Sequence, residues 1–178
     1  MKRLWAPWRM TFIREAPRTC GPGRRGCLFC RLRRERRDEE NLVLLRRTLG
    51  FAVMNRYPYN NGHLMVAPAR HVADVERLRP DEWLELHRLI KDCMRALRLE
   101  MRPDGYNIGM NLGRVAGAGV AHHLHVHIVP RWLGDSNFMP LLAETKVVSE
   151  HLLETYRRLR KRLLTQRRAS ASSSPSSS

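Results

Sequence analysis

The strongest chemical signal in the sequence is a run of histidines that alternate with aliphatic residues between positions 123 and 129. His123, His125 and His127 are each separated by one apolar residue. In a β-strand successive side chains point to opposite faces, so the histidines would share one face while the aliphatic residues enter the core. Neutral imidazole is a nucleophile and protonated imidazole binds phosphate oxygens. The pattern therefore suits phosphoryl or nucleotidyl transfer.

Two other interpretations of this strand compete with transfer chemistry. A histidine-rich strand can simply face solvent, although three aliphatic residues on the opposite face disfavour that interpretation. A His-x-His pair is also a common metal-ligand pattern. Adjacent histidines on one strand face lie about 6.6 Å apart, so an undistorted strand cannot bring all three to one ion. The spacing therefore favours a different role for each of the three histidines over a single metal ion bound by all three.

A second cluster of reactive side chains is the Cys27-x-x-Cys30 pair. This spacing supplies half of a tetrahedral zinc site, and the alternative is two buried thiols that pack as small hydrophobes. Cys20 and Cys93 lack such spacing and are expected to be structural. The sequence starts with charged residues and no hydrophobic stretch typical of a secretory signal. We therefore expect reduced thiols and a cytoplasmic protein.

The elements that must position these residues are short strands and two helices. Apolar patterning predicts strands over 42–45, 51–54, 63–67, 106–111 and 123–129, and helices over 81–101 and from Ser149 to about Leu164. This order predicts an α+β domain with a mainly antiparallel five-stranded sheet, one central helix and one C-terminal helix. We expect a basic N-terminal extension at 1–40, a catalytic domain at 41–165 and a disordered Ser-rich tail at 166–178.

Composition narrows the class of partner. The 178 residues carry 33 Lys and Arg against 17 Asp and Glu, a formal net charge of +16, yet only four of the basic residues are lysine. The excess charge suggests phosphate-bearing partners, and the preference for arginine is equally typical of a GC-rich genome. Nucleic-acid binding is disfavoured because aromatic residues do not alternate with the basic ones. No apolar run reaches the roughly 20 residues of a membrane span.

With Pro130 and Arg131 behind it, the histidine strand resembles the signature of the histidine triad (HIT) superfamily of nucleotidyl hydrolases and transferases. Segment 55–68 is similar to the nucleotide-binding strand pair that precedes the triad in this superfamily, and segment 111–120 to the loop before it. The flanks at 4–9 and 131–139 resemble the bacterial branch of diadenosine tetraphosphate phosphorylases. The resemblance implies a HIT-like fold and a homodimer.

The resemblance also assigns roles to the histidines. It implies that His125 attacks the α-phosphorus and carries the nucleotide as a covalent phosphoramidate. His123 and His127 occupy the flanking positions that orient the nucleophile and contact phosphates. The backbone carbonyl of His123 would accept the proton on one ring nitrogen of His125 and leave the other nitrogen reactive.

Four further positions match substrate-binding residues of the superfamily. Asn55 corresponds to a ribose-binding position, Asn111 to a polar position beside the phosphates, and Gly117 and Gly119 to glycines whose amides approach phosphate oxygens. Many members place a hydroxyl residue before the triad to assist the leaving group, where this chain has glycine. Three alternatives are therefore open: His122 donates the proton, His127 donates it, or the leaving ATP or ADP oxyanion needs no donor because its pKa is already low.

The resemblance also implies the two missing zinc ligands and the reaction that the enzyme catalyses. Several bacterial HIT proteins bind structural zinc with positions that correspond to Cys27, Cys30, His71 and His123. The implied reaction is cleavage of diadenosine tetraphosphate with inorganic phosphate as acceptor, which gives ADP and ATP. The alternative within the superfamily is a nucleoside phosphoramidase or another nucleotidyl hydrolase.

Overall fold

The computed structural model describes residues 26–135 and 148–172. A five-stranded antiparallel sheet forms its centre, in the order β1-β2-β3-β5-β4. The strands are β1 (Val43–Arg46), β2 (Gly50–Met54), β3 (Leu64–Pro68), β4 (Gly105–Gly109) and β5 (Val126–Arg131). The α+β class and the mainly antiparallel five-stranded sheet predicted from the sequence are confirmed.

Two helices pack on one face of the sheet. They are α3 (Pro80–Met101) and α5 (Val148–Ser172), which share a buried cluster with alternate strand residues such as Met54, Leu64 and Ile128. The buried side of α5 contains Tyr156, Leu159 and Leu163, which follow one another at helical steps of three and four residues. The helix continues to Ser172, past the predicted end near Leu164. No glycine or proline stands in this stretch to end it.

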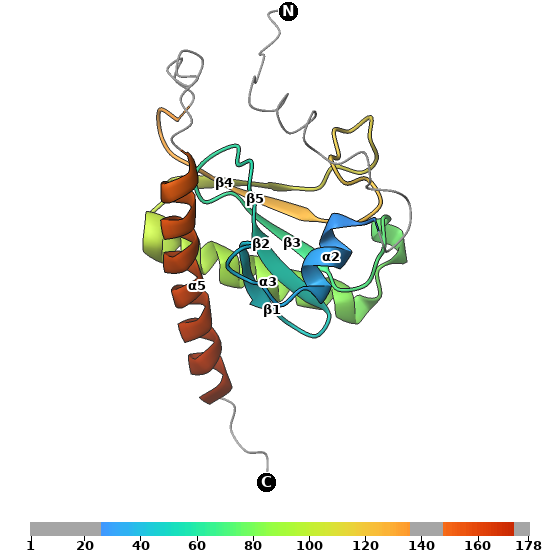
Figure 1. Cartoon of the computed structure of the whole chain (residues 1–178), viewed down its shortest axis with the longest axis horizontal. Helices are drawn as coiled ribbons and strands as arrows, with labels where there is room; N and C mark the ends of the chain where they lie inside the picture. Colours follow the sequence, from blue (N-terminus) through green and yellow to red (C-terminus); the bar gives the residue numbers. More distant parts are fainter. Residues whose placement is uncertain (1–25, 136–147, 173–178) are drawn as a thin grey trace, which may run out of the picture.

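The opposite face is covered by a short helix that the sequence did not predict. Helix α2 (Leu28–Arg34) inserts Phe29 and Leu32 into a second buried cluster with Phe51 and Met65 from the strands. Figure 1 shows α2 in front of the sheet and α3 behind it. Part of the expected N-terminal extension therefore packs on the sheet, while the domain boundaries themselves stay a prediction.

The segment between the third strand and the central helix is fixed by one buried charge. It contains a short 3-10 helix, η1 (Val75–Arg77), and ends where Glu82 accepts hydrogen bonds from the Arg70 guanidinium at 2.9 and 2.7 Å and from the Arg79 amide at 3.0 Å. Arg70 holds the pKa of the Glu82 carboxyl down at about 2. These bonds define the start of α3 and anchor the loop that carries His71.

None of the described helices is long and apolar enough to cross a bilayer.

Candidate functional site

The three histidines do not lie on one regular strand, which corrects the sequence-based prediction. Strand β5 starts only at Val126, so His127 lies in the ladder while His123 and His125 precede it. The pairing of β3 with β5 ends at Val66 and Val126, although β3 continues to Pro68 along β2. The amide of Leu124 instead donates to the carbonyl of Val72 at 2.6 Å. This departure lets the histidine rings turn toward different partners.

His123 lies in a cluster of four metal-ligating side chains. The ligand atoms of Cys27, Cys30, His71 and His123 all lie within 4.8 Å of one another. Cys27 Sγ is 3.3 Å and Cys30 Sγ 3.6 Å from His123 Nδ1, and Cys30 Sγ is 3.3 Å from His71 Nδ1. The structure thus brings together the complete predicted ligand set from α2, the loop after β3 and the segment before β5.

The donor set fits a tetrahedral zinc ion. Zn–S bonds of about 2.3 Å and Zn–N bonds of about 2.0 Å place ligand atoms about 3.3 to 3.8 Å apart. The contacts of 3.3, 3.3 and 3.6 Å fall in that range. His123 Nε2 lies 2.9 Å from the carbonyl of Pro68, which fixes the proton on Nε2 and directs the Nδ1 lone pair to the thiols. With four protein ligands, such a site has no open position for substrate.

His125 is prepared as a neutral imidazole with one free nitrogen. Its Nδ1 lies 2.9 Å from the carbonyl of His123, so Nδ1 carries the proton and Nε2 keeps a lone pair. The hydrogen bond implied by the resemblance is thus present. The ring is 5 % exposed and packs on Phe29 with centroids 4.8 Å apart. Burial lowers the pKa of His125, opposed by the carbonyl bond. A buried neutral imidazole is suited to nucleophilic attack.

His63 is a functional candidate that the sequence analysis missed. The Tyr59 amide donates to His63 Nδ1 at 3.2 Å, so Nδ1 is unprotonated and the proton lies on Nε2. That nitrogen is 2.9 Å from His127 Nδ1, which must accept. His127 therefore carries its own proton on Nε2, where it can be given to an oxygen. Burial, followed by the charges of His127 and His125, lowers the pKa of His63 to about 3 and keeps it neutral.

The contact between His63 and His127 depends on the tertiary structure. His63 and His127 are 64 positions apart, and the antiparallel pairing of β3 with β5 brings them together. Gly62 precedes His63 with a φ of 80°, which favours glycine and sets the turn into β3. The only sequence signal was the resemblance of segment 55–68 to a nucleotide-binding strand pair.

Asn55 lies beside the histidines, and its side chain makes hydrogen bonds within the protein. Its Nδ2 is 3.2 Å from His63 Nδ1, and its Oδ1 accepts from the Tyr57 amide at 3.0 Å. It thus helps hold His63 in the required tautomer. The ribose-binding role of Asn55 stays a prediction.

The loop predicted to contact phosphates has its own internal bonds. The amide of Gly117 donates to the carbonyl of Arg114 at 2.9 Å, and Asn111 Nδ2 lies 3.5 Å from the carbonyl of Gly117. Gly117 has a φ of 88°, a conformation that favours glycine. Gly119 is exposed and is followed by Val120, which packs in the cluster around Phe29. The loop is therefore tied to the histidine face, while its phosphate contacts stay a prediction.

The other residues that the sequence analysis singled out are two cysteines, His122 and the flanking segments. Cys93 is buried in α3, where desolvation raises the pKa of its thiol to about 12, as expected of a structural cysteine. His122 is half-buried, and its role as proton donor stays a prediction. Cys20 and the two flanking segments at 4–9 and 136–139 lie outside the described residues.

Comparisons with known proteins agree with this arrangement. The HIT domain family model matches residues 36–132. AP-4-A phosphorylase of Mycobacterium tuberculosis is 43% identical over 162 residues, covering 89% of this chain and 83% of that protein. An uncharacterised HIT-like protein of Methanocaldococcus jannaschii is 34% identical over 109 residues, 61% of this chain and 81% of that protein.

Solved structures share the fold. A Zn-bound histidine triad family protein from Mycobacterium smegmatis superposes with a TM-score of 0.65 at 26% identity, covering 83% of this chain and 99% of that one. The geometry of the histidines, the extent of the family match and these relatives agree, and the chain belongs to the HIT family of nucleotidyl transferases and hydrolases.

Proposed function

We propose that this enzyme cleaves dinucleoside polyphosphates, with diadenosine tetraphosphate as substrate and inorganic phosphate as acceptor. The observation that carries the proposal is the 2.9 Å contact between His125 Nδ1 and the His123 carbonyl, which leaves Nε2 of a buried imidazole free to attack. The name of the relative from M. tuberculosis, AP-4-A phosphorylase, supports this choice of substrate.

In the first step His125 Nε2 forms a bond to the α-phosphorus and the bond to the bridging oxygen breaks. ATP leaves and AMP stays on the enzyme as a phosphoramidate. His127 Nε2 carries the proton that can pass to the leaving oxygen, since His63 occupies its Nδ1. In the second step a phosphate oxygen attacks the same phosphorus, the P–N bond breaks and ADP is released. Asn55, Asn111, Gly117 and Gly119 are proposed to hold the ribose and phosphates.

Product analysis tests this reaction. Diadenosine tetraphosphate and phosphate together should give equal amounts of ADP and ATP on anion-exchange chromatography, with slow or no turnover when phosphate is omitted. Fast release of AMP without phosphate would show a hydrolase instead. Faster turnover of adenosine phosphoramidate than of the dinucleotide would favour the phosphoramidase alternative.

We further propose a structural zinc ion held by Cys27, Cys30, His71 and His123. Support comes from the tight grouping of the four ligand atoms and from the zinc in the related M. smegmatis protein. Bound zinc would tie α2 to the segment before β5 and supply no reacting group. Elemental analysis of reconstituted protein should give about one zinc per chain, and Cys27→Ser should lose the metal. Loss of activity on chelation with an unchanged fold would make the metal catalytic and refute a structural role.

The remaining proposals concern assembly and location. Strand β4 stands at the margin of the sheet, and Ile108 on it is 43% exposed. Such an edge can pair with a second copy, which supports a homodimer. None of the described cysteines, Cys27, Cys30 and Cys93, forms a disulfide, which supports a reducing cytoplasm.

A further inference from the structure

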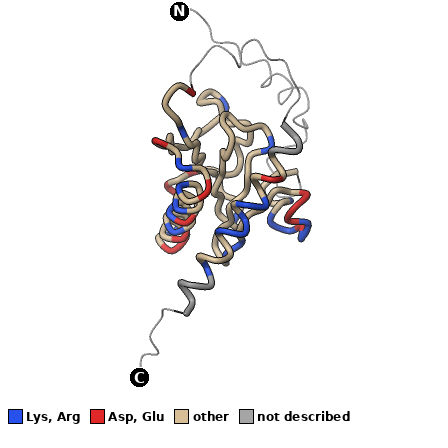
Figure 2. The backbone as a smooth tube through the Cα atoms, turned by 90° about the vertical axis from the view of Figure 1, so that its left-hand side faces the viewer, with Lys and Arg blue, Asp and Glu red and all other residues tan. Residues whose placement is uncertain are grey.

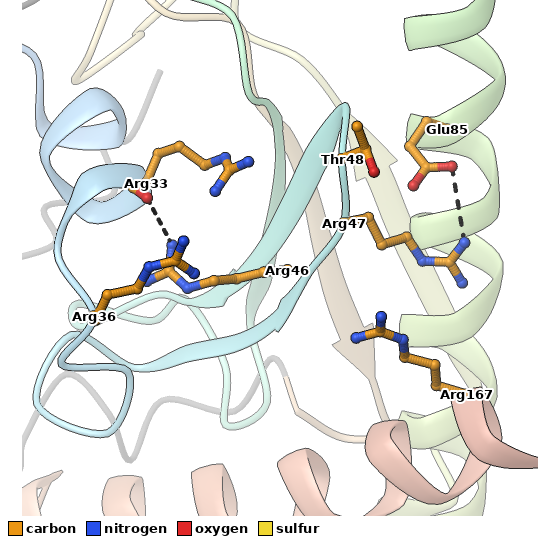
Figure 3. Close-up of a pocket in the computed structure, with 7 residues that line it drawn as sticks. All are labelled: Arg33, Arg36, Arg46, Arg47, Thr48, Glu85 and Arg167. Atoms are coloured by element: carbon orange, nitrogen blue, oxygen red, sulfur yellow. Dashed lines mark hydrogen bonds and ion pairs between the residues drawn. The ribbon is translucent and has the colours of Figure 1, made fainter.

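A second basic site lies away from the histidines, around the free edge of β1. It is a pocket of about 590 Å³ lined by Arg33, Arg36, Arg46, Arg47, Thr48, Glu85 and Arg167. These residues come from α2 and the turn after it, from the β1–β2 hairpin, and from α3 and α5. Figure 3 shows guanidinium groups approaching the same space from α2 on one side and α5 on the other. None of the lining residues belongs to the histidine site or the metal cluster.

Two of the five arginines are neutralised by the protein. Arg46 pairs with Asp38 and also donates to three backbone carbonyls near the end of α2. Arg47 pairs with Asp92 and Glu85 across to α3. These two side chains build the wall of the pocket, and their removal would damage the fold. The Nε of Arg47 is buried and has no hydrogen-bond acceptor within the described part of the chain.

The other three arginines are not balanced in this way. Arg33, Arg36 and Arg167 make no side-chain hydrogen bond or ion pair with the side chains that the structure describes, those of 26–135 and 152–167. By contrast, Arg157, Arg158, Arg160 and Arg162 on the same C-terminal helix all pair with acidic residues. Figure 2 shows Lys and Arg positions concentrated on α2 and along α5. Arg36 and Arg167 are exposed and Arg33 is half-buried, so solvent screens part of their mutual repulsion, and an anion bound between the three guanidinium groups would lower it further.

The chemistry of the lining identifies the kind of anion. The pocket contains no aromatic side chain on which a base could stack and no apolar side chain for an acyl chain. Guanidinium groups bind phosphate oxygens through paired N–H donors, and the hydroxyl of Thr48 adds a further donor. Three unbalanced positive charges, from α2, the turn after it and α5, match a chain of linked phosphates better than a single phosphate.

We propose that this pocket is a second anion site that binds a polyphosphate chain, separate from the site of cleavage. Its ligand is recognised through linked phosphoryl groups, whether they belong to inorganic tripolyphosphate or to the phosphate end of a nucleotide. The proposal does not depend on which substrate the histidines cleave.

The test is calorimetric titration of the full chain with inorganic tripolyphosphate, with AMP present in excess to occupy the histidine site. We compare the double variant Arg33→Ala/Arg167→Ala with Arg34→Ala/Lys161→Ala, which removes the same charge from the same two helices outside the pocket. Arg34 and Lys161 are exposed. The pocket variant should weaken tripolyphosphate binding at least about tenfold, the control variant less than about twofold.

A second arm separates the two sources of phosphate. ATP should bind the pocket with about the affinity of tripolyphosphate, since the lining offers nothing to the base. Both double variants should keep turnover of diadenosine tetraphosphate within about twofold, because neither changes the histidine site.

The proposal would be overturned by equal weakening in both double variants, which indicates diffuse charge, or by the absence of tripolyphosphate binding. Pocket-dependent binding of single-stranded RNA without binding of tripolyphosphate would also overturn it. Turnover lost together with binding would refute two separate sites.

Discussion

At the scale of single residues, the histidine site is defined by which ring nitrogen carries each proton. The carbonyl of Pro68 fixes His123, the carbonyl of His123 fixes His125, and the Tyr59 amide fixes His127 through His63. A backbone amide can only donate and a carbonyl can only accept, so each ring has one tautomer that satisfies its partner. A nucleophilic nitrogen and a proton-bearing nitrogen thus lie on adjacent rings, whose centroids are 4.8 Å apart.

His63 is expected to act through His127 as a positioning residue. His63→Ala removes the donor to His127 Nδ1 and frees that ring to adopt either tautomer. The kcat for diadenosine tetraphosphate should fall about 100-fold, within the range of general acid catalysis, while KM changes less than about threefold. His87→Ala, on the exposed side of α3, is the matched control and should leave both constants unchanged. A parallel rise in KM would point to substrate binding instead.

Burial of His125 predicts how activity depends on pH. Its lowered pKa means that the imidazole stays neutral somewhat below the ordinary histidine value of 6.5, so kcat/KM should decline only at a pH below that value. Phe29→Leu exposes more of the ring and should raise its pKa, which moves the acid limb of the pH profile toward 6.5. An acid limb at the same pH in both proteins would show that Phe29 does not control this ionisation.

At the scale of elements, the sequence located the strands and the long helices but not the helix that covers the site. Continuous apolar runs within 51–54 and 63–67 match β2 and β3 because both strands lie between two buried clusters and are buried on both faces. Helix α2 has seven residues, of which only Phe29 and Leu32 are buried. Two buried apolar residues in an arginine-rich stretch are too few to show the periodicity of a helix. The Cys27-x-x-Cys30 pair indicated that this segment has a function, but it did not indicate that the segment is helical.

The start of α3 yields a test of stability. Glu82 is 1% exposed and bonds to Arg70 and Arg79. Glu82→Gln should lower the free energy of unfolding by about 2 kcal/mol at pH 7, because two charge-assisted hydrogen bonds are weakened. The pKa of Glu82 in the folded protein, about 2, is below the ordinary value of 4.5, so the wild type should lose this stability as the pH falls from about 4.5 to about 2. The variant should lack that loss; an unchanged acid response in urea unfolding would contradict the assignment.

At the scale of the whole molecule, the resemblance to the HIT superfamily predicted which residues far apart in the sequence lie close together. The periodicity of apolar residues alone could not predict such contacts. Cys27 and His123 are 96 positions apart, and their spacing carries no information about contact. The irregular backbone at His123 and His125 was missed because alternation predicts a strand wherever it occurs. The early end of the β3–β5 pairing at Val126 and the bond from the Leu124 amide to the Val72 carbonyl are tertiary effects.

The exposed margin of the sheet predicts the oligomeric state. If β4 edges join two copies, Ile108→Arg should weaken the dimer at least about tenfold in sedimentation equilibrium, since a charge would be buried at the contact. Leu99→Arg provides a control on α3, where the side chain is 51% exposed. A dimer unaffected by Ile108→Arg would place the interface elsewhere.

In the proposed reaction His125 carries the nucleotide as a covalent intermediate. Rapid acid-free quenching of the enzyme during turnover of diadenosine tetraphosphate without phosphate, followed by peptide mass spectrometry, should find AMP on the peptide that contains His125. His125→Asn should show no adduct and lose turnover by several orders of magnitude while its circular dichroism stays unchanged. An adduct on another residue, or near-normal turnover in a folded His125→Asn protein, would contradict the account.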